Sequence, residues 1–149
     1  MTGEVTQPRR RDILRRAHPL PWIAPLLILS SASLAASPCT GVDRRLPEAD
    51  RPALERAIAA ELGLPRVELL QSFRDGRWRI LCVNTFRTDE TFLFYRRDPP
   101  RGRSLTRWGG AARMDEEPEI RRWVRENAPG IPRRLAACFA RHVTHDRNR

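Results

Sequence analysis

The dipeptide Asp75-Gly76 constrains the fold more than any other feature, because it lies between two runs of alternating apolar and polar residues. A two-residue loop of this composition is a strong signal for a β-hairpin with a type I′ turn, in which both central residues need positive φ. The sequence therefore predicts two antiparallel strands, over residues 67–74 and 77–84. Counting outward from the turn pairs Phe73 with Trp78, which sets the register.

Alternation along these strands divides their side chains between two faces. The predicted core face consists of Val67, Leu69, Phe73, Trp78, Ile80 and Cys82. The predicted outer face consists of Glu68, Ser72, Arg74, Arg77 and Arg79, with Leu70, Leu81 and Val83 making it partly apolar. The outer face of the hairpin is therefore expected to be an arginine-bearing surface, with Arg87, Arg96 and Arg97 near it.

In the segment before the hairpin, apolar residues recur at the spacing of a helix. Leu54, Ile58 and Leu62 form an apolar stripe in a helix predicted over residues 50–63, which ends at Gly63. We expect the predicted sheet to cover this apolar stripe. A third strand over residues 91–96 and a short fourth strand over 104–108 extend the predicted sheet.

Two helices are predicted after the strands, one opened by Asp115 and the last by Pro132. The order helix, antiparallel three- to four-stranded meander, two C-terminal helices predicts a single α+β domain over residues 50–145. Residues 36–49 form an N-terminal tail and 146–149 a basic tail. This layout is similar to that of small cystatin-like or PepSY-like envelope domains, and layout by itself implies no function.

Residues 1–35 have the order of a secretory signal peptide, with a basic stretch, an apolar run and small residues before a cleavage site at Ala36. The segment Arg10-Arg11-Asp12-Ile13-Leu14-Arg15 resembles the twin-arginine export motif, and ordinary Sec export is the alternative route. We expect a periplasmic or secreted protein. An uncleaved segment that anchors the chain in the inner membrane is the second interpretation.

Every one of the 28 basic residues is Arg, which excludes Schiff-base and phosphate-loop lysine chemistry. Five arginines and two acidic residues precede residue 36, so the remainder keeps a net charge of +7. After export, this charge favours an acidic protein or an anionic envelope component as partner, rather than nucleic acid. Membrane contact is expected only transiently, through the signal peptide. The sequence predicts no cofactor and no small-molecule ligand.

The three cysteines predict one disulfide, because an oxidising compartment favours pairing and leaves one thiol over. Cys82 alternates with Ile80 in the predicted core, which favours a buried free thiol. The preferred bridge is therefore Cys39 to Cys138, which would join the N-terminal tail to the last helix.

Cys138, His142 and His145 also share one helical face at spacing i, i+4, i+7, which can present three ligands to a metal. A disulfide would remove Cys138 from this set, and His145 lies where the helix is expected to end. These residues are weak metal candidates, and the sequence predicts no metal site and no catalytic residue.

The favoured function is a non-enzymatic binding module that uses Arg74, Arg77 and Arg79, with Trp108 exposed on a glycine-containing loop. One alternative is a small metal-dependent or hydrolytic enzyme built on Cys138, His142 and His145. A membrane-tethered envelope assembly factor is the other.

Overall fold

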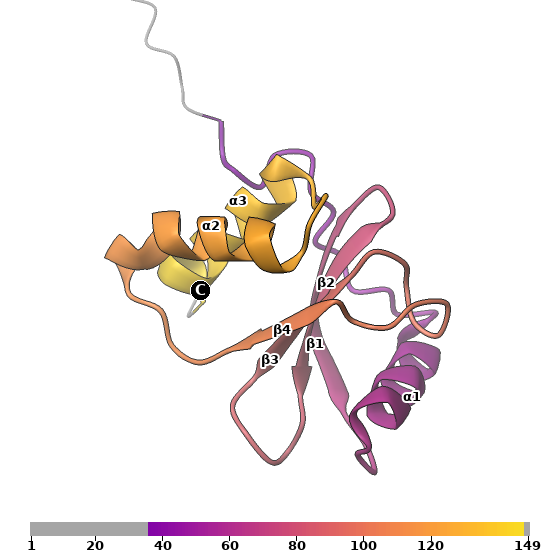
Figure 1. The fold of residues 1–149 in the computed structure, drawn as a ribbon. Coiled ribbons are helices and arrows are strands. Elements are labelled where there is room, and N and C mark those ends of the chain that lie inside the picture. The colour runs from indigo at the N-terminus through magenta and orange to yellow at the C-terminus, as the bar shows by residue number, and fades with distance from the viewer. Residues whose placement is uncertain (1–35, 148–149) are drawn as a thin grey trace, which may run out of the picture. The chain divides into compact units, whose positions relative to one another are not determined.

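A computed structural model describes residues 36–147, which form an antiparallel sheet with three α-helices (Figure 1). The helices are α1 (Arg51–Leu62), α2 (Glu117–Asn127) and α3 (Arg133–Arg141). The strands are β1 (Glu68–Asp75), β2 (Trp78–Asn84), β3 (Thr91–Tyr95) and β4 (Thr106–Gly109), in the order β1-β2-β3-β4. A 3₁₀ turn (Met114–Glu116) precedes α2, and a π-helical turn (His142–Asp146) continues α3.

The predicted α+β class and the antiparallel meander are confirmed. The predicted signal peptide over residues 1–35 lies outside the described residues. Within residues 36–147, no helix combines the length and the apolar character needed to span a bilayer.

Helices cover both faces of the sheet, α1 on one side and α2 with α3 on the other (Figure 1). On the α1 side, Leu54 and Ile58 pack in one cluster with sheet residues such as Leu81. On the other side, Phe139 of α3 packs edge-on against Phe94, with ring centroids 5.0 Å apart. The prediction that the outer face of the hairpin lies in solvent is therefore wrong, because α1 covers it.

The hairpin turn differs from the prediction by one residue. Asp75 pairs with Trp78 and Phe73 with Ile80, so Gly76 and Arg77 are the central residues of the turn. Gly76 has φ +59°, whereas Arg77 has no positive φ. Positive φ at the first central residue alone is the pattern of a type II′ turn, and a glycine accepts it without strain.

A β-bulge between Leu69 and Gln71 changes which face β1 presents. Leu69 lies opposite Val83 in the α1-side cluster, while Phe73 lies in the cluster beneath α3. The extra residue reverses the alternation, since side chains along a strand have a period of two. The prediction that Val67 and Leu69 share a face with Phe73 is therefore wrong.

The N-terminal tail is fixed to the domain by a covalent bond and by backbone pairing. Cys39 and Cys138 form the predicted disulfide, across a sequence separation of 99 residues. Further along, Asp43 and Arg74 exchange backbone hydrogen bonds of 2.9 and 2.7 Å, which extends the outer edge of β1. The tail thereby covers part of an edge that would otherwise offer unpaired backbone groups.

Glu61 of α1 ties the helix to the β3–β4 connection. Its carboxylate accepts the backbone N–H of Ser104 at 2.9 Å, the Ser104 hydroxyl at 2.5 Å and the Tyr95 hydroxyl at 3.1 Å. Burial, with the neighbouring Glu61 charge, raises the pKa of Tyr95 above its usual range. One charged acceptor therefore satisfies three donors from β3 and the following loop.

Candidate functional site

The predicted binding arginines do not all reach solvent. Arg74 and Arg77 are exposed at the β1–β2 turn. Arg79 is only 5% exposed, and its guanidinium lies 3.2 Å from the Asp98 carboxylate. Because Arg79 points toward the side that α1 covers, the expectation that its side chain is exposed is wrong.

The fold adds four arginines from distant parts of the chain to this end of the sheet. Each contacts a residue of the β1–β2 hairpin or its tail: Arg44 lies over the Phe73 ring, Arg45 pairs with Asp43, Arg96 lies over the Trp78 ring and Arg134 pairs with Asp75. We call the combined set the hairpin-end arginine surface: Arg44, Arg45, Arg74, Arg77, Arg96 and Arg134.

Local contacts hold most of these guanidinium groups in place. Arg96 lies 5.2 Å from the Trp78 ring centroid and donates to the Pro129 carbonyl at 2.7 Å. Arg134 makes a two-point ion pair with the buried Asp75 carboxylate. Arg74 donates from Nε to the Gly76 carbonyl at 3.2 Å. Fixed guanidinium groups lose less conformational entropy when they bind a planar anion.

The charge of the surface is strongly unbalanced. Two of the six guanidinium groups form ion pairs with carboxylates, Arg45 with Asp43 and Arg134 with Asp75. Hydrogen bonds from Arg45 lower the pKa of Asp43 to about 2, so this carboxylate stays ionised near neutral pH. Arg74 and Arg77 have no carboxylate within 4 Å among residues 36–147, so an excess of positive charge remains at the turn.

Trp108 lies in β4 rather than on a loop. It pairs with Phe92, and its ring packs edge-on against Phe139 with centroids 5.6 Å apart. Part of the indole faces a shallow hollow shared with Trp123 of α2. The side chain is half-buried in the core, on the α2 side of the sheet, and the expectation of an aromatic on a flexible loop is wrong.

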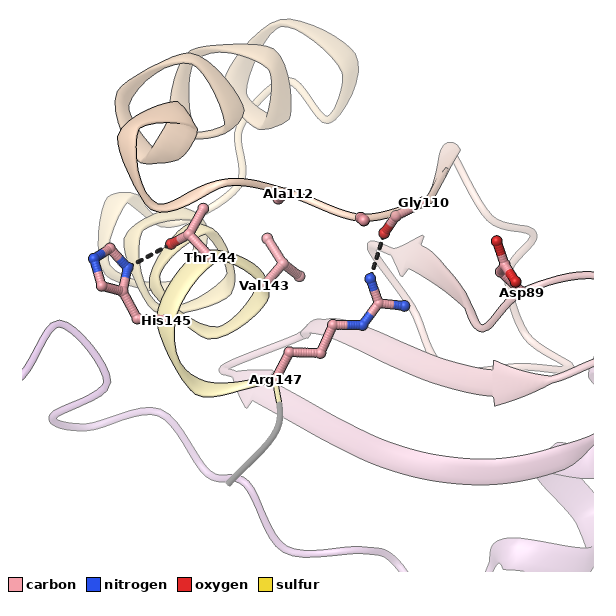
Figure 2. A pocket seen from close by; sticks show the side chains of 8 residues that line it. Asp89, Gly110, Ala112, Val143, Thr144, His145 and Arg147 are labelled. Carbon is pink, nitrogen blue, oxygen red and sulfur yellow. Dashed lines mark hydrogen bonds between the residues drawn. The ribbon is translucent and has the colours of Figure 1, made fainter.

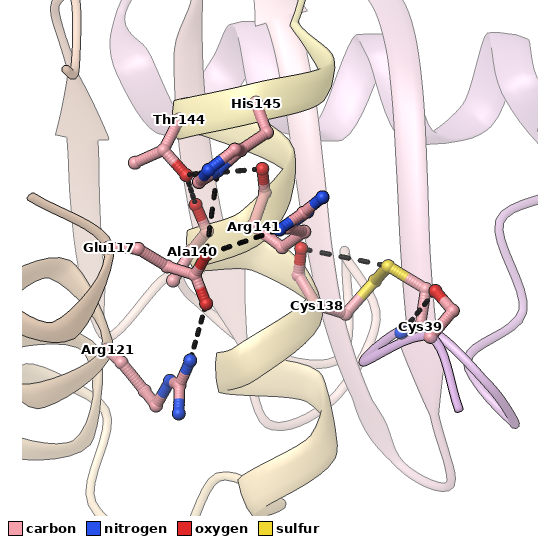
Figure 3. A network of polar contacts seen from close by, with 9 residues as sticks. Cys39, Glu117, Arg121, Cys138, Ala140, Arg141, Thr144 and His145 are labelled. Atoms are coloured by element: carbon pink, nitrogen blue, oxygen red, sulfur yellow. Dashed lines mark hydrogen bonds and ion pairs between the residues drawn. A yellow bond between two sulfur atoms is a disulfide. The ribbon is translucent and has the colours of Figure 1, made fainter. Parts of the chain in front are cut away.

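Cys138, His142 and His145 do not converge on one point. The sulfur of Cys138 is bonded to Cys39, and His142 is buried against the Phe73 ring with centroids 5.0 Å apart. His145 instead approaches Glu117 of α2, with 3.5 Å between Nδ1 and a carboxylate oxygen (Figure 3). Within the described part of the chain, no three His, Cys, Asp or Glu side chains gather in a way that could hold a metal.

Glu117 is the centre of a polar network between α2 and α3. Arg121 lies 2.5 Å from its carboxylate and Arg141 lies 3.9 Å away (Figure 3). The Thr144 hydroxyl lies 2.7 Å from Nδ1 of His145 and donates to the Ala140 carbonyl at 2.8 Å. Glu117 and Thr144 thus contact the same ring nitrogen, whereas a relay through a histidine uses opposite nitrogens.

A pocket of about 440 Å³ opens beside this network, lined in part by Thr144, His145, Arg147 and Asp89 (Figure 2). Arg147 crosses it and donates to the Gly110 carbonyl. His145 points away from Arg147, toward Thr144 (Figure 2). Thr144 and His145 contact each other and Arg147 is held by Gly110, so these groups do not form a nucleophile and base facing a common point.

Besides Tyr95, the buried residues His142 and Cys82 have strongly shifted pKa values. Burial, with the nearby Arg44 charge, lowers the pKa of His142 to about 4. Burial, with the Glu90 carboxylate, raises the pKa of the free Cys82 thiol to about 12. His142 is therefore neutral and Cys82 a thiol near neutral pH, as expected of packing residues.

Sequence reasoning missed Arg44, Arg45 and Arg134 as members of the surface, and it placed Arg96 near the hairpin together with Arg87 and Arg97. Arg44 and Arg45 belong to a tail without periodicity, and Arg96 and Arg134 are brought in by tertiary packing. Comparison of the chain with known protein families, curated proteins and solved structures gives no match.

Proposed function

We propose that this chain is an exported, non-enzymatic binding module that holds an acidic partner protein on the hairpin-end arginine surface. The observation that carries the proposal is the convergence of six arginines from four segments of the chain on one end of the sheet, of which Arg45 and Arg134 form ion pairs with carboxylates. Guanidinium groups form two parallel hydrogen bonds with a carboxylate, so a surface of this kind suits Asp and Glu side chains.

The Cys39–Cys138 disulfide supports export, because disulfides persist in oxidising compartments. Nucleic acid is a poor candidate partner in such a compartment. The alternative of a membrane-tethered assembly factor depends on residues 1–35, which lie outside the described residues.

The metal-dependent or hydrolytic alternative has less support. The disulfide occupies Cys138, burial keeps His142 neutral among aromatic rings, and His145 is engaged with Glu117 and Thr144. A binding role requires none of these groups to react.

The test compares two double charge reversals in the full chain. Arg74→Glu with Arg77→Glu changes the hairpin-end arginine surface. Arg87→Glu with Arg107→Glu is the matched control: both residues are exposed, neither has an ion-pair partner among the described residues, and the net charge falls by the same amount. The probe is a fluorescein-labelled polyglutamate peptide, and binding is followed by anisotropy.

Each exposed charge contact contributes about 0.5 kcal/mol. Two lost attractions and two new repulsions therefore weaken the peptide complex by about 2 kcal/mol, or roughly thirtyfold. We expect the control reversal to weaken it only a few-fold, because Arg87 and Arg107 act over longer, screened distances. Equal weakening by both reversals would mean that net charge, not this surface, binds the peptide.

A further inference from the structure

Phe86 in the loop between β2 and β3 has a backbone conformation that bulky residues rarely adopt. Its φ of +58° is the only positive value at a non-glycine residue within 36–147, and 47% of the residue is exposed. Core packing does not explain this conformation, since half of the side chain is in solvent. Strained residues that contribute little to the core are often retained for what they contact.

The loop holds Phe86 in this conformation through short-range hydrogen bonds. The Phe86 backbone N–H donates to Asn84 Oδ1 at 2.9 Å. Next to it, the Thr85 hydroxyl oxygen accepts the backbone N–H groups of Arg87 at 3.4 Å and Thr88 at 3.3 Å. Asx and ST turns of this kind fix a loop without tertiary contacts.

One arginine stacks on the exposed ring, and two more lie at the same end of the sheet. The Arg66 guanidinium lies 4.2 Å from the Phe86 ring centroid. Arg87 and Arg107 line a neighbouring hollow of about 310 Å³, together with Leu62 and Leu64 of the α1 end. In the described chain none of the three arginines has a carboxylate within 4 Å, and all three are exposed.

Two acidic residues near this end, Asp89 and Glu90, lie toward the α3 side of the sheet. Asp89 lines the pocket that Arg147 crosses, on the α3 side of the sheet, and Glu90 lies 3.8 Å from Arg147. Glu68, at the start of β1, is exposed and pairs with Asn84 through the backbone. We call the set of Phe86, Arg66, Arg87 and Arg107 the loop-end surface. It lies at the opposite end of the sheet from the β1–β2 turn, beside the loop that follows α1 (Figure 1).

We propose that the loop-end surface binds an anionic lipid bilayer, with Phe86 inserted at the level of the acyl chains and the three arginines on lipid phosphates. A protruding aromatic ring flanked by basic residues is the arrangement that peripheral membrane contacts use. A bilayer accepts a projecting apolar side chain without a pocket of matching shape, whereas an acidic protein would have to supply one. Exposed Pro65 beside Arg66 adds apolar surface at the same end.

This contact is independent of the peptide-binding function proposed above. Vesicles of equal parts phosphatidylglycerol and phosphatidylcholine are the probe, pure phosphatidylcholine vesicles are the lipid control, and binding of the full chain is measured by co-sedimentation. Phe86→Gly is expected to weaken binding about tenfold, the loss of one partly inserted aromatic side chain. The same substitution is expected to raise the melting temperature by about 4 °C, because glycine accepts the positive φ.

Leu105→Gly is the matched control, since Leu105 is 48% exposed and lies in the β3–β4 connection. It is expected to leave vesicle binding unchanged. The reversal Arg87→Glu with Arg107→Glu is expected to weaken vesicle binding at least thirtyfold, and Arg74→Glu with Arg77→Glu only a few-fold.

A site-specific readout separates this contact from any binding by residues 1–35. An environment-sensitive nitrobenzoxadiazole label on Phe86→Cys is expected to shift its emission to the blue on anionic vesicles, and the same label on Leu105→Cys is not. Unchanged emission at position 86, equal binding of wild type and Phe86→Gly, or equal binding to pure phosphatidylcholine would each overturn the proposal. Loss of polyglutamate binding in Phe86→Gly would also overturn it, because an acidic protein would then be the occupant.

Discussion

Removal of the Cys39–Cys138 disulfide should reveal how strongly the N-terminal tail stabilises the domain. Cys39→Ala is the substitution of choice, because Cys39 is only half-buried whereas Cys138 lies in the core. In the variant the tail keeps its other contacts with the domain, among them the backbone bonds between Asp43 and Arg74 and the packing of Val42. The native fold is therefore expected to survive with the tail in place.

The expected magnitude follows from the length of the closed loop. A cross-link over 99 residues reduces the entropy of the unfolded chain by an amount worth about 4.7 kcal/mol at 25 °C in the chain-entropy model. Little packing is lost at the half-buried position. Since small domains have a total free energy of unfolding of about 5–15 kcal/mol, the variant should be markedly less stable but still measurable.

Urea denaturation followed by tryptophan fluorescence measures this difference. Cys39→Ala should have a free energy of unfolding 4–5 kcal/mol below that of the oxidised wild type, the range that the chain-entropy model gives for about 100 residues. Its m-value should be slightly larger, because the unfolded chain is no longer cross-linked. Reduced wild type should match the variant, and the variant should not respond to reductant. A difference below about 1 kcal/mol would refute the loop-entropy argument.

Three further predictions concern buried groups. Glu61→Ala should lower the free energy of unfolding by about 3 kcal/mol, because three hydrogen bonds to a charged acceptor are lost. In the same urea titration, the control Glu119→Ala at an exposed position should change the free energy of unfolding by less than about 0.5 kcal/mol. Because the pKa of His142 is lowered to about 4 in the folded state, the unfolded state binds more protons below pH 6.5. Stability should therefore fall by up to about 3 kcal/mol as the pH drops from 7 to 4, and His142→Gln should flatten this dependence in denaturation curves across that range. Intact mass after alkylation should show no modified thiol in the native oxidised protein. Cys82 should be modified after unfolding in urea, and all three cysteines should be modified after unfolding with reductant. Rapid labelling of Cys82 in the native protein would contradict its burial.

Local signals in the sequence predicted the elements and their order well. The stripe of Leu54 and Ile58 packs on the sheet as expected, and Gly63 ends α1 with a φ of +64°. The disulfide followed from counting cysteines and from the burial of Cys82. These features depend on periodicity or on one residue's chemistry, so a single sequence contains them.

The errors came from features without a local signal. One extra residue in β1, between Leu69 and Gln71, reverses which side chains face α1, and no pattern in the sequence marks it. Arg79 lies on the covered side because α1 packs there and Asp98 neutralises it. The positive φ of Phe86 belongs to a loop that contains Asn and Thr, and these side chains signal a turn but not an exposed aromatic ring.

The candidate site was only half predictable for the same reason. Arg74 and Arg77 were found because they flank the hairpin turn. Arg96 and Arg134 join them only through contacts with Trp78 and Asp75, which depend on how β3 and α3 pack on the hairpin. Charge along the sequence therefore indicated the chemistry of the surface, and the tertiary fold determined its extent.

We propose that an acidic partner binds the hairpin-end arginine surface, and the resonances of the arginine side chains report on this contact directly. Nε–H resonances of a ¹⁵N-labelled chain can be followed by NMR during titration with the polyglutamate peptide. Binding at this surface predicts saturable shifts at Arg74, Arg77 and Arg96, with Arg87 and Arg107 unchanged. Shifts spread evenly over exposed arginines at both ends of the sheet, or none at Arg74 and Arg77, would contradict it.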